Sequence, residues 1–194
     1  MQIFLDLETT NLAPMNKNGY CDYTDLKKYE TCRIIQIYMC IYKNNRLIDE
    51  IYTYIDPKMQ IPDKAKEITG ITDEQVKNKK LTKEHIHKIK SFLSLGNIII
   101  GHNITFDINI LASELYRLNE IELAKILFNK KYFCTMKNAY RLQKGGKYIK
   151  LEALYLSFYK DKIGNAHDAK TDVLMCKKLY DVYRLFNKIK FEQS

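Results

Sequence analysis

Two acidic residues in an apolar stretch at the start of the chain are the first candidates for chemistry. Asp6 and Glu8 interrupt the apolar run of residues 2–10, which is typical of a buried β-strand. Residues two apart in a strand point to the same face, so the two carboxylates should lie side by side. Such a pair repels itself and loses hydration. A hard divalent cation such as Mg²⁺, which takes oxygen ligands, is the simplest compensation.

Two further acids, Asp107 and Asp172, stand near the starts of predicted helices. Asp107 follows a buried strand and falls in a first helical turn, where the helix dipole alone would favour an acid. Asp172 extends the apolar face of the closing helix back by one turn, so it should face the core. A helix start or a buried salt bridge would explain either acid alone, but with the pair in the first strand the chain has four acids that could converge. His167 lies five residues before Asp172 and cannot share its helical face, so we expect it in a loop or cap beside the site.

The segments that must position these residues show clear strand and helix patterns. Stretches 33–42 and 47–55 are β-branched and aromatic and are separated by a short polar turn, which predicts an antiparallel hairpin after the first strand. Further short strands are predicted at 97–101 and 132–135, and helices at 63–69, 82–95, 104–115, 121–128, 136–142, 151–159 and 169–188. Thr72-Asp73-Glu74-Gln75 is typical of the capped start of another segment. Asn103 is a candidate cap of the helix that follows it. This order indicates an α/β fold in one domain spanning residues 1–194, with a mixed central sheet flanked by helices.

Three connecting segments carry little regular pattern. Residues 11–31 are polar and rich in Tyr, which indicates an excursion beside the end of the first strand; it either shapes substrate access or is an inert insertion. Residues 144–147 are predicted to be a basic, mobile linker, and residues 161–166 a loop.

Charge and cysteine content narrow the class of protein. The chain has 32 Lys and Arg against 23 Asp and Glu, a net charge of +9, which favours a polyanionic partner, although a biased genome composition would give the same excess. The lysine-rich run at 77–80 is predicted to be a solvated face; together with Lys83, Lys88 and Lys90 it could also follow a phosphate backbone. Five cysteines without paired spacing argue against a zinc site or a disulfide framework and predict a reducing intracellular compartment, cytoplasmic or nuclear. We expect no membrane segment and no signal peptide.

Three motifs resemble those of the DnaQ-like (DEDD) 3′-to-5′ exonucleases, in the family's order and at similar separations across nearly the whole chain. They are Asp6-Leu7-Glu8-Thr9-Thr10, then Gly101-His102-Asn103 with Phe106-Asp107, then His167-Asp168-Ala169 with Asp172. A single Asp-x-Glu is a weak signal, but the three together are specific. Histidine rather than tyrosine before the final acid resembles the DEDDh branch. The resemblance implies an RNase H-like fold, with three antiparallel strands followed by parallel ones.

The resemblance also implies a two-metal site. Asp6, Glu8 and Asp172 would bind one Mg²⁺ or Mn²⁺ ion. Asp6 would bridge to a second ion, which Asp107 would support, so that each site holds two ions. His167 would accept the proton of the attacking water near neutral pH.

A second group of residues is expected to contact the nucleic acid: Thr9, Thr10, Leu12, Asn103 and Phe106. Phe106 is predicted either to stack on a base or to pack in the core. Thr69 stands where many relatives have a histidine, and residues 11–31 exceed the length found in compact members, so contacts to the terminal base and substrate access should differ from the family pattern.

Three functional hypotheses follow. The first is a 3′-to-5′ exonuclease on single-stranded DNA or on frayed and mismatched ends, as in proofreading or repair, releasing nucleoside 5′-monophosphates. The second is an RNA-directed enzyme of the same branch, acting on short oligoribonucleotides or tails. The third is a catalytically silent module that binds nucleic acid or a polymerase, which the intact acids disfavour because binding alone does not require them. The expected partners are a nucleic acid with a free 3′ end, a polymerase, or a second copy of the chain.

Overall fold

The computed structural model describes residues 1–142, 146–161, 164 and 167–186 of the chain. Parts of three predicted segments lie outside the described residues: 144–145 of the basic linker, 162–163 and 165–166 of the following loop, and 187–188 of the closing helix.

The core of the fold is a five-stranded sheet with the strand order β5-β4-β1-β6-β7. The strands are β1 (Gln2–Thr9), β4 (Ile34–Lys43), β5 (Arg46–Tyr54), β6 (Ile98–Gly101) and β7 (Tyr132–Cys134). β1 pairs antiparallel with β4, and β4 with β5. β6 lies parallel to β1 on its other side, and β7 parallel to β6. The predicted mixed sheet, with three antiparallel strands followed by parallel ones, is confirmed.

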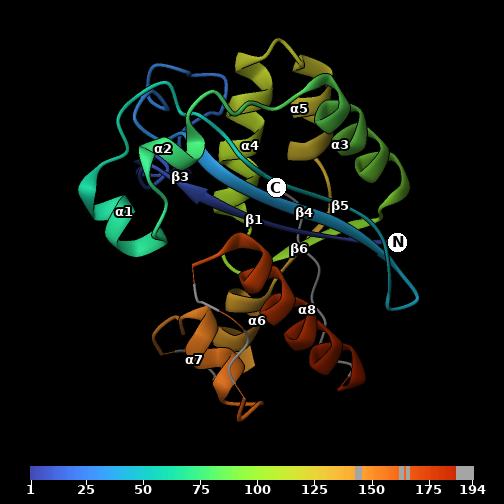
Figure 1. The fold of residues 1–194 in the computed structure, drawn as a ribbon. Coiled ribbons are helices and arrows are strands. Elements are labelled where there is room, and N and C mark those ends of the chain that lie inside the picture. The colour runs from blue at the N-terminus through green and yellow to red at the C-terminus, as the bar shows by residue number, and fades with distance from the viewer. Residues whose placement is uncertain (143–145, 162–163, 165–166, 187–194) are drawn as a thin grey trace.

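Helices cover both faces of this sheet (Figure 1). One face carries α3 (Lys83–Leu95), α4 (Thr105–Arg117) and α5 (Ile121–Phe128). The other carries α6 (Thr135–Leu142), α7 (Leu151–Leu156) and α8 (Ala169–Leu185). The alternation of β1 explains the two layers, because Ile3, Leu5 and Leu7 are buried with the first set of helices. Phe4 points the other way and is buried with the second set.

Two short helices pack beside the end of the sheet in a separate small core. α1 (Asp63–Thr69) ends at Gly70, whose φ of 68° is a left-handed conformation that glycine adopts without steric cost. α2 (Asp73–Val76) starts with a capping box, in which the backbone of Thr72 donates to Gln75 at 2.7 Å. This helix start confirms the cap predicted from the sequence.

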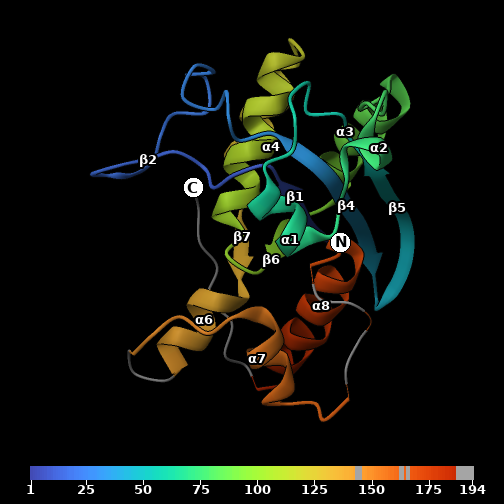
Figure 2. The ribbon, with the colours of Figure 1, turned by 60° about the vertical axis from the view of Figure 1, so that its left-hand side comes forward.

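Residues 11–31 fold back as an ordered excursion. They contain a small hairpin, β2 (Met15–Asn16) with β3 (Gly19–Tyr20), and Figure 2 shows β2 projecting away from the sheet. The base of the excursion is anchored in the core, since the hydroxyl of the buried Tyr29 donates to the carbonyl of Cys21 at 2.7 Å. The sequence predicted the excursion but not its hairpin or its buried base.

Two sequence predictions about helix ends need correction. Asn103 does not cap α4: Ile104 precedes the helix without a side-chain cap, and Asn103 instead takes a left-handed conformation with φ of 58°, which asparagine tolerates better than most residues. α7 ends at Leu156, before the predicted Tyr159.

Within the described part of the chain, helices with the length and apolar character needed to cross a membrane are absent.

Candidate active site

Asp6 and Glu8 lie on the face of β1 that is covered by α8. Both are almost fully buried, with 9% and 8% of their surface exposed. The pairing of β1 with β4 shifts register between Glu8 and Thr9, so the regular ladder is interrupted directly after the second acid. Irregularities of this kind are common beside active sites, where they redirect side chains. The strand thus presents two carboxylates and then leaves the sheet.

Asp107 reaches the same place from the opposite layer. It lies in the first turn of α4 and is buried, and its Oδ1 accepts a hydrogen bond of 3.1 Å from the backbone N–H of Leu7. Leu7 stands between the two acids of β1, so this bond fixes the start of α4 against the acidic end of the strand. The pairing is a long-range contact that joins the first and second sequence motifs.

Asp172 completes the cluster from α8. Glu8, His167 and Asp172 offer ligand atoms that all lie within 4.8 Å of one another. Oδ1 of Asp172 is buried and has no hydrogen-bond partner among the described residues. A buried carboxylate oxygen without a partner is costly, and it points to a group that the protein itself does not supply.

The electrostatics of the cluster give the same indication. Burial, with repulsion from Asp107 and Asp172, holds the pKa of Asp6 well above its ordinary value. Burial and repulsion from Asp172 raise the pKa of Glu8 to about 8. Burial also raises the pKa of Asp107, although hydrogen bonds from its own backbone and from Leu7 oppose the rise.

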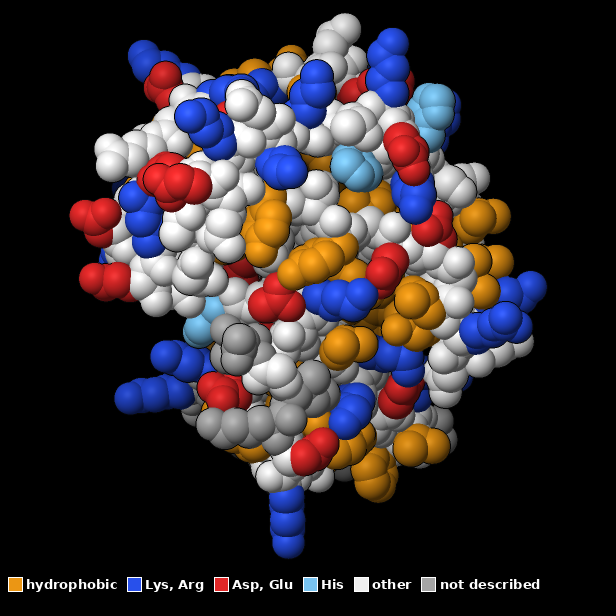
Figure 3. Space-filling view, in the orientation of Figure 1, with side chains coloured by type: hydrophobic (Ala, Val, Ile, Leu, Met, Phe, Trp, Pro, Cys, Tyr) orange, Lys and Arg blue, Asp and Glu red, His pale blue; other side chains and the backbone are white. Residues whose placement is uncertain are grey.

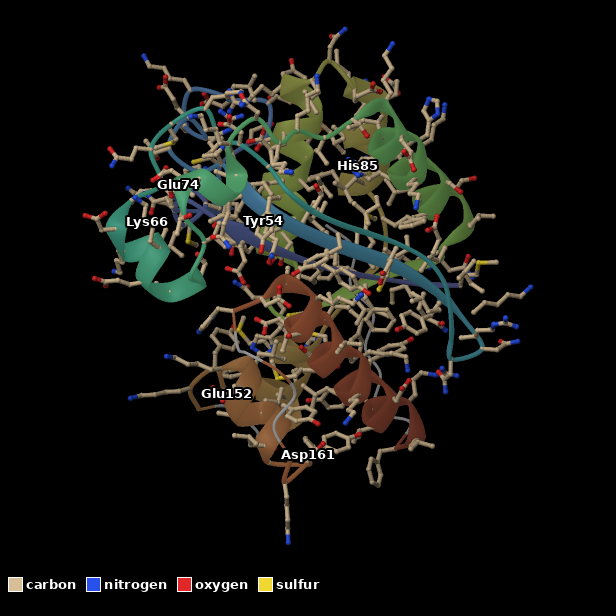
Figure 4. The ribbon with its side chains drawn as sticks, in the orientation of Figure 1. Tyr54, Lys66, Glu74, His85, Glu152 and Asp161 are labelled. Carbon is tan, nitrogen blue, oxygen red and sulfur yellow. The ribbon has the colours of Figure 1, made fainter. Side chains whose placement is uncertain are left out.

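The pKa of Asp172 rises to about 6, because burial outweighs attraction to His167 and a backbone hydrogen bond from that residue. Glu152 of α7, labelled in Figure 4, adds further negative charge near Asp172. A bound cation would stabilise the ionised form of these carboxylates and so lower their raised pKa values.

This donor set fits a hard divalent cation. The four acids offer oxygen ligands, which Mg²⁺ and Mn²⁺ prefer, and Asp172 offers an oxygen with no competing partner among the described residues. The described cysteines are all buried and free, and none belongs to the group of ligand atoms around Asp172. Asp6, Glu8, Asp107 and Asp172 are therefore the residues that could hold metal.

His167 stands at the exposed rim of the cluster. Its backbone has φ of 64°, and it directly precedes Asp168, the N-cap of α8, whose side chain accepts a hydrogen bond from the backbone of Thr171. This is the loop position beside the site that the sequence predicted. His102 of the second motif is different: burial lowers its pKa to about 4, and its ring nitrogens are bound to Thr135 and to the carbonyl of Ile149.

The predicted nucleic-acid contacts fall into two groups. Leu12 is 79% exposed next to the acidic end of β1, and Phe106 and Asn103 are half-buried at the start of α4. Thr9 also lies at the surface, with its hydroxyl donating to the carbonyl of Asn11. Thr10 is buried, and its hydroxyl both donates to the Thr31 carbonyl and accepts from the backbone of Arg33. The Thr10 side chain thus fastens the end of β1 to residues 31–33, and its contact with the nucleic acid stays a prediction.

Several residues at the site were not identified from the sequence. Tyr20, from the excursion, lies edge-on to Phe106 with ring centroids 6.5 Å apart, and the Asn103 side chain lies near its hydroxyl and partly offsets the rise that burial causes in its pKa. Gln36 and Tyr52 contact the start of α8. Local sequence pattern gives no signal for these contacts, because they depend on the path of the excursion and on strand pairing.

The lysine-rich segment gives little support for a continuous phosphate track. Lys88 is paired with Asp49, at 2.8 Å between Nζ and Oδ1. In Figure 3, Lys and Arg side chains are spread over the visible face among acidic ones instead of forming one strip. His85, in the first turn of α3, forms a capping box with Thr82, whose backbone N–H donates to its ring at 3.2 Å.

Known proteins similar to this chain include a polymerase and solved exonuclease structures. The PolC-type DNA polymerase III of Thermotoga maritima is 28% identical over 165 residues, covering 84% of this chain but only 10% of that protein. Exonuclease X, in complex with 5′ overhanging duplex DNA, superimposes with a TM-score of 0.63 at 20% identity over 96% of this chain and 93% of its own. The nuclease domain of 3′hExo, a DEDDh family member bound to rAMP, gives a TM-score of 0.68 at 14% identity over 100% and 96%.

The structural similarities show that the fold is that of the RNase H-like exonucleases, as the motifs implied. Residues 3–180 match the exonuclease family RNase_T, and this span includes all three motifs. The resemblance to the DnaQ-like exonucleases is thereby confirmed, and the chain belongs to the RNase_T exonuclease family.

Proposed function

We propose that the chain is a metal-dependent 3′-to-5′ exonuclease of the DEDDh type, which removes nucleotides from single-stranded or frayed DNA ends and releases nucleoside 5′-monophosphates. One observation carries the proposal: the buried Glu8 of β1 and the half-buried Asp172 of α8 offer ligand atoms within 4.8 Å of each other and of His167, and one oxygen of Asp172 has no protein partner among the described residues. A protein that only binds nucleic acid has no need for such a cluster.

The residues take separate roles in this proposal. Asp6, Glu8 and Asp172 would hold one divalent cation, and Asp107 would support a second one shared with Asp6. Two such cations stabilise the attacking and leaving oxygens of an in-line phosphoryl displacement.

His167, exposed at the rim, would accept the proton of the attacking water, since its side chain reaches the cluster and remains open to solvent. Leu12 and Phe106 offer apolar surface against which the bases of a frayed end could stack without sequence preference. These roles are consistent with cleavage from one end of a strand.

The preference for DNA is supported by Exonuclease X, which is bound to DNA, and by the polymerase relative. The 3′hExo structure holds rAMP, which keeps RNA as the alternative substrate. Association with a polymerase is a further hypothesis suggested by the relative.

A time course on matched single-stranded DNA and RNA, each labelled at the 5′ end, tests the proposal. Parallel reactions contain Mg²⁺, Mn²⁺ or EDTA. We expect a ladder that shortens from the 3′ end, that requires the metal, and that advances faster on DNA. Faster cleavage of RNA would support the alternative substrate. Full-length strands in every reaction would contradict the exonuclease and favour a silent binding module.

A further inference from the structure

The start of α8 is held by side chains from two neighbouring antiparallel strands, β4 and the edge strand β5. Gln36 of β4 accepts a hydrogen bond of 2.9 Å from the backbone of Ala169 and donates one of 3.3 Å to the hydroxyl of Tyr52 on β5. That hydroxyl in turn donates to Oδ1 of Asp168 at 2.6 Å. The other oxygen of Asp168 accepts from the backbone and the hydroxyl of Thr171, both at 3.1 Å.

Asp168 is the residue through which this network reaches the site. It follows His167 directly, and its carbonyl accepts the first helical hydrogen bond of Asp172 at 3.0 Å. A displacement of Asp168 would therefore move both the proposed base and a proposed metal ligand. Both of its carboxylate oxygens are already bound to protein groups, so its side chain is occupied in fixing the helix start.

The conformation of His167 makes such a restraint necessary. Its φ of 64° lies in the left-handed region, which a non-glycine residue adopts only when its surroundings hold it there. The following residue, Asp168, restrains His167 from its C-terminal side. Hydrogen bonds from Tyr52 and from the backbone of Thr171 fix the two oxygens of the Asp168 carboxylate.

Tyr52 is not a core residue, and packing does not explain its hydroxyl. Its side chain lies on the edge strand with 45% of its surface exposed. Its ring contacts Tyr38 edge-on at 5.8 Å and lies 6.5 Å from Tyr54, which is labelled in Figure 4 on the same strand. Gln36, in contrast, is 2% exposed and stands directly opposite Glu8 in the strand pairing. The network thus begins beside a metal-site acid and ends at the cap of α8.

We propose that Tyr52 is a positioning residue, whose hydroxyl acts through Asp168 to hold His167 and Asp172 in register with the acids of β1. The inference rests on the proposed exonuclease function. It adds to that function a dependence on β5, the edge strand of the sheet.

The test is Tyr52→Phe, which keeps the ring and removes only the hydroxyl. On 5′-labelled single-stranded DNA with Mg²⁺, we expect kcat to fall about tenfold, the size of one lost hydrogen bond to a charged group. KM and the thermal unfolding midpoint should stay close to those of the wild type. The matched control is Tyr42→Phe, because Tyr42 packs on α8 further along, with Lys177 over its ring, and should leave kcat unchanged.

A double-mutant cycle identifies the route of the effect. If the hydroxyl acts through Asp168, Tyr52→Phe should cause no further loss of kcat in an Asp168→Ala background. An unchanged kcat in Tyr52→Phe would overturn the inference. A loss that is fully additive with Asp168→Ala, or one matched by a lower unfolding midpoint and by Tyr42→Phe, would overturn it as well. A wild-type chain that leaves DNA intact would instead overturn the proposed function, and this inference with it.

Discussion

The two faces of β1 differ sharply although they belong to the same eight-residue strand. On one face Ile3, Leu5 and Leu7 are buried among apolar side chains of α3, α4 and α5. On the other, Phe4 packs edge-on against Tyr42 and Tyr180, but the next two positions toward the strand end are acids. The first face is apolar along its whole length. The second face carries acidic side chains instead of apolar ones at the end of the strand that lies near the start of α8.

The difference has an energetic consequence. Each fully buried aliphatic side chain on the apolar face stabilises the fold by about 1.5–3 kcal/mol. On the acidic face, burial and mutual repulsion raise the pKa of both Asp6 and Glu8, so without a cation these residues oppose folding as they ionise. A site that destabilises the protein in this way is more readily explained by function than by architecture.

The largest effect is expected from Asp6→Asn on the acidic face. The variant keeps the shape of the side chain but removes a ligand shared by both proposed ions, so cleavage should fall by about 10³-fold, within the range for lost electrostatic stabilisation of a transition state. Without metal the same variant should unfold at a higher urea concentration than the wild type, because repulsion within the cluster is relieved. Labelled-strand assays and urea unfolding in EDTA measure the two quantities; full activity would contradict the assignment.

The opposite face should respond in the opposite way. Leu5→Ala leaves a cavity beside α4 and should lower the free energy of unfolding by about 2–5 kcal/mol. The fraction that remains folded should cleave DNA at nearly the wild-type kcat. Urea unfolding combined with activity per folded molecule checks this, and a Leu5→Ala protein that is stable but inactive would break the proposed separation of the two faces.

A somewhat smaller loss is expected at the rim of the acidic face. His167→Ala should lower kcat about 100-fold, the lower range for loss of a general base. Because its proposed role is proton transfer and not contact with the bases, DNA binding should change little. Rates measured across pH, together with DNA affinity in Ca²⁺, separate the two effects. An unchanged pH–rate profile would exclude His167 as the base.

A smaller effect is expected on the free energy of unfolding of the metal-free protein, which should fall as the pH rises. The pKa values of Glu8 and Asp172 rise from 4.5 and 3.8 to about 8 and about 6, so the folded state holds protons that the unfolded state releases. Their contribution to stability is complete below about pH 4 and is lost as the pH rises toward about 8. Urea unfolding in EDTA at about pH 5 and pH 8 should show this decline, and Glu8→Gln should reduce it. A decline of equal size in Glu8→Gln would show that the ionisation of Glu8 is not its cause.

The smallest effect is expected where the excursion meets the site. Phe106→Ala removes a half-buried ring that Tyr20 supports from the side, and KM for single-stranded DNA should rise a few-fold, about 1 kcal/mol for one lost stacking contact. The exposed Met15 of the same excursion provides the control, since Met15→Ala should leave KM unchanged if the hairpin tip stands away from the strand. Steady-state kinetics on one labelled oligonucleotide distinguish the two variants.

Local sequence pattern was sufficient to predict much of the fold and the convergence of the acids. The period of two in β1 predicted that its acids share a face, and three short motifs identified the acids that meet there. The start of α2 was also correct, because Thr72 and Gln75 interact within a single turn.

Contacts set by tertiary structure were not predictable in this way. Tyr52 meets Asp168 only because β5 pairs with β4 in one particular register, and Tyr20 meets Phe106 only through the path of the excursion. Asn103 shows a local rule being overridden: a good helix cap by type, it is used in a left-handed turn whose side chain meets Tyr20. These failures lie around the candidate site, where function constrains the backbone most.

The most direct test of the acidic face as a metal site is a Mn²⁺ titration followed by thermal unfolding at about pH 8. Wild type, Asp6→Asn and Leu5→Ala would be compared over the same range of metal concentration. We predict that Mn²⁺ raises the unfolding midpoint of the wild type and of Leu5→Ala by similar amounts and that Asp6→Asn loses most of this rise. An equal rise in Asp6→Asn would contradict the assignment of the buried acids to a divalent cation.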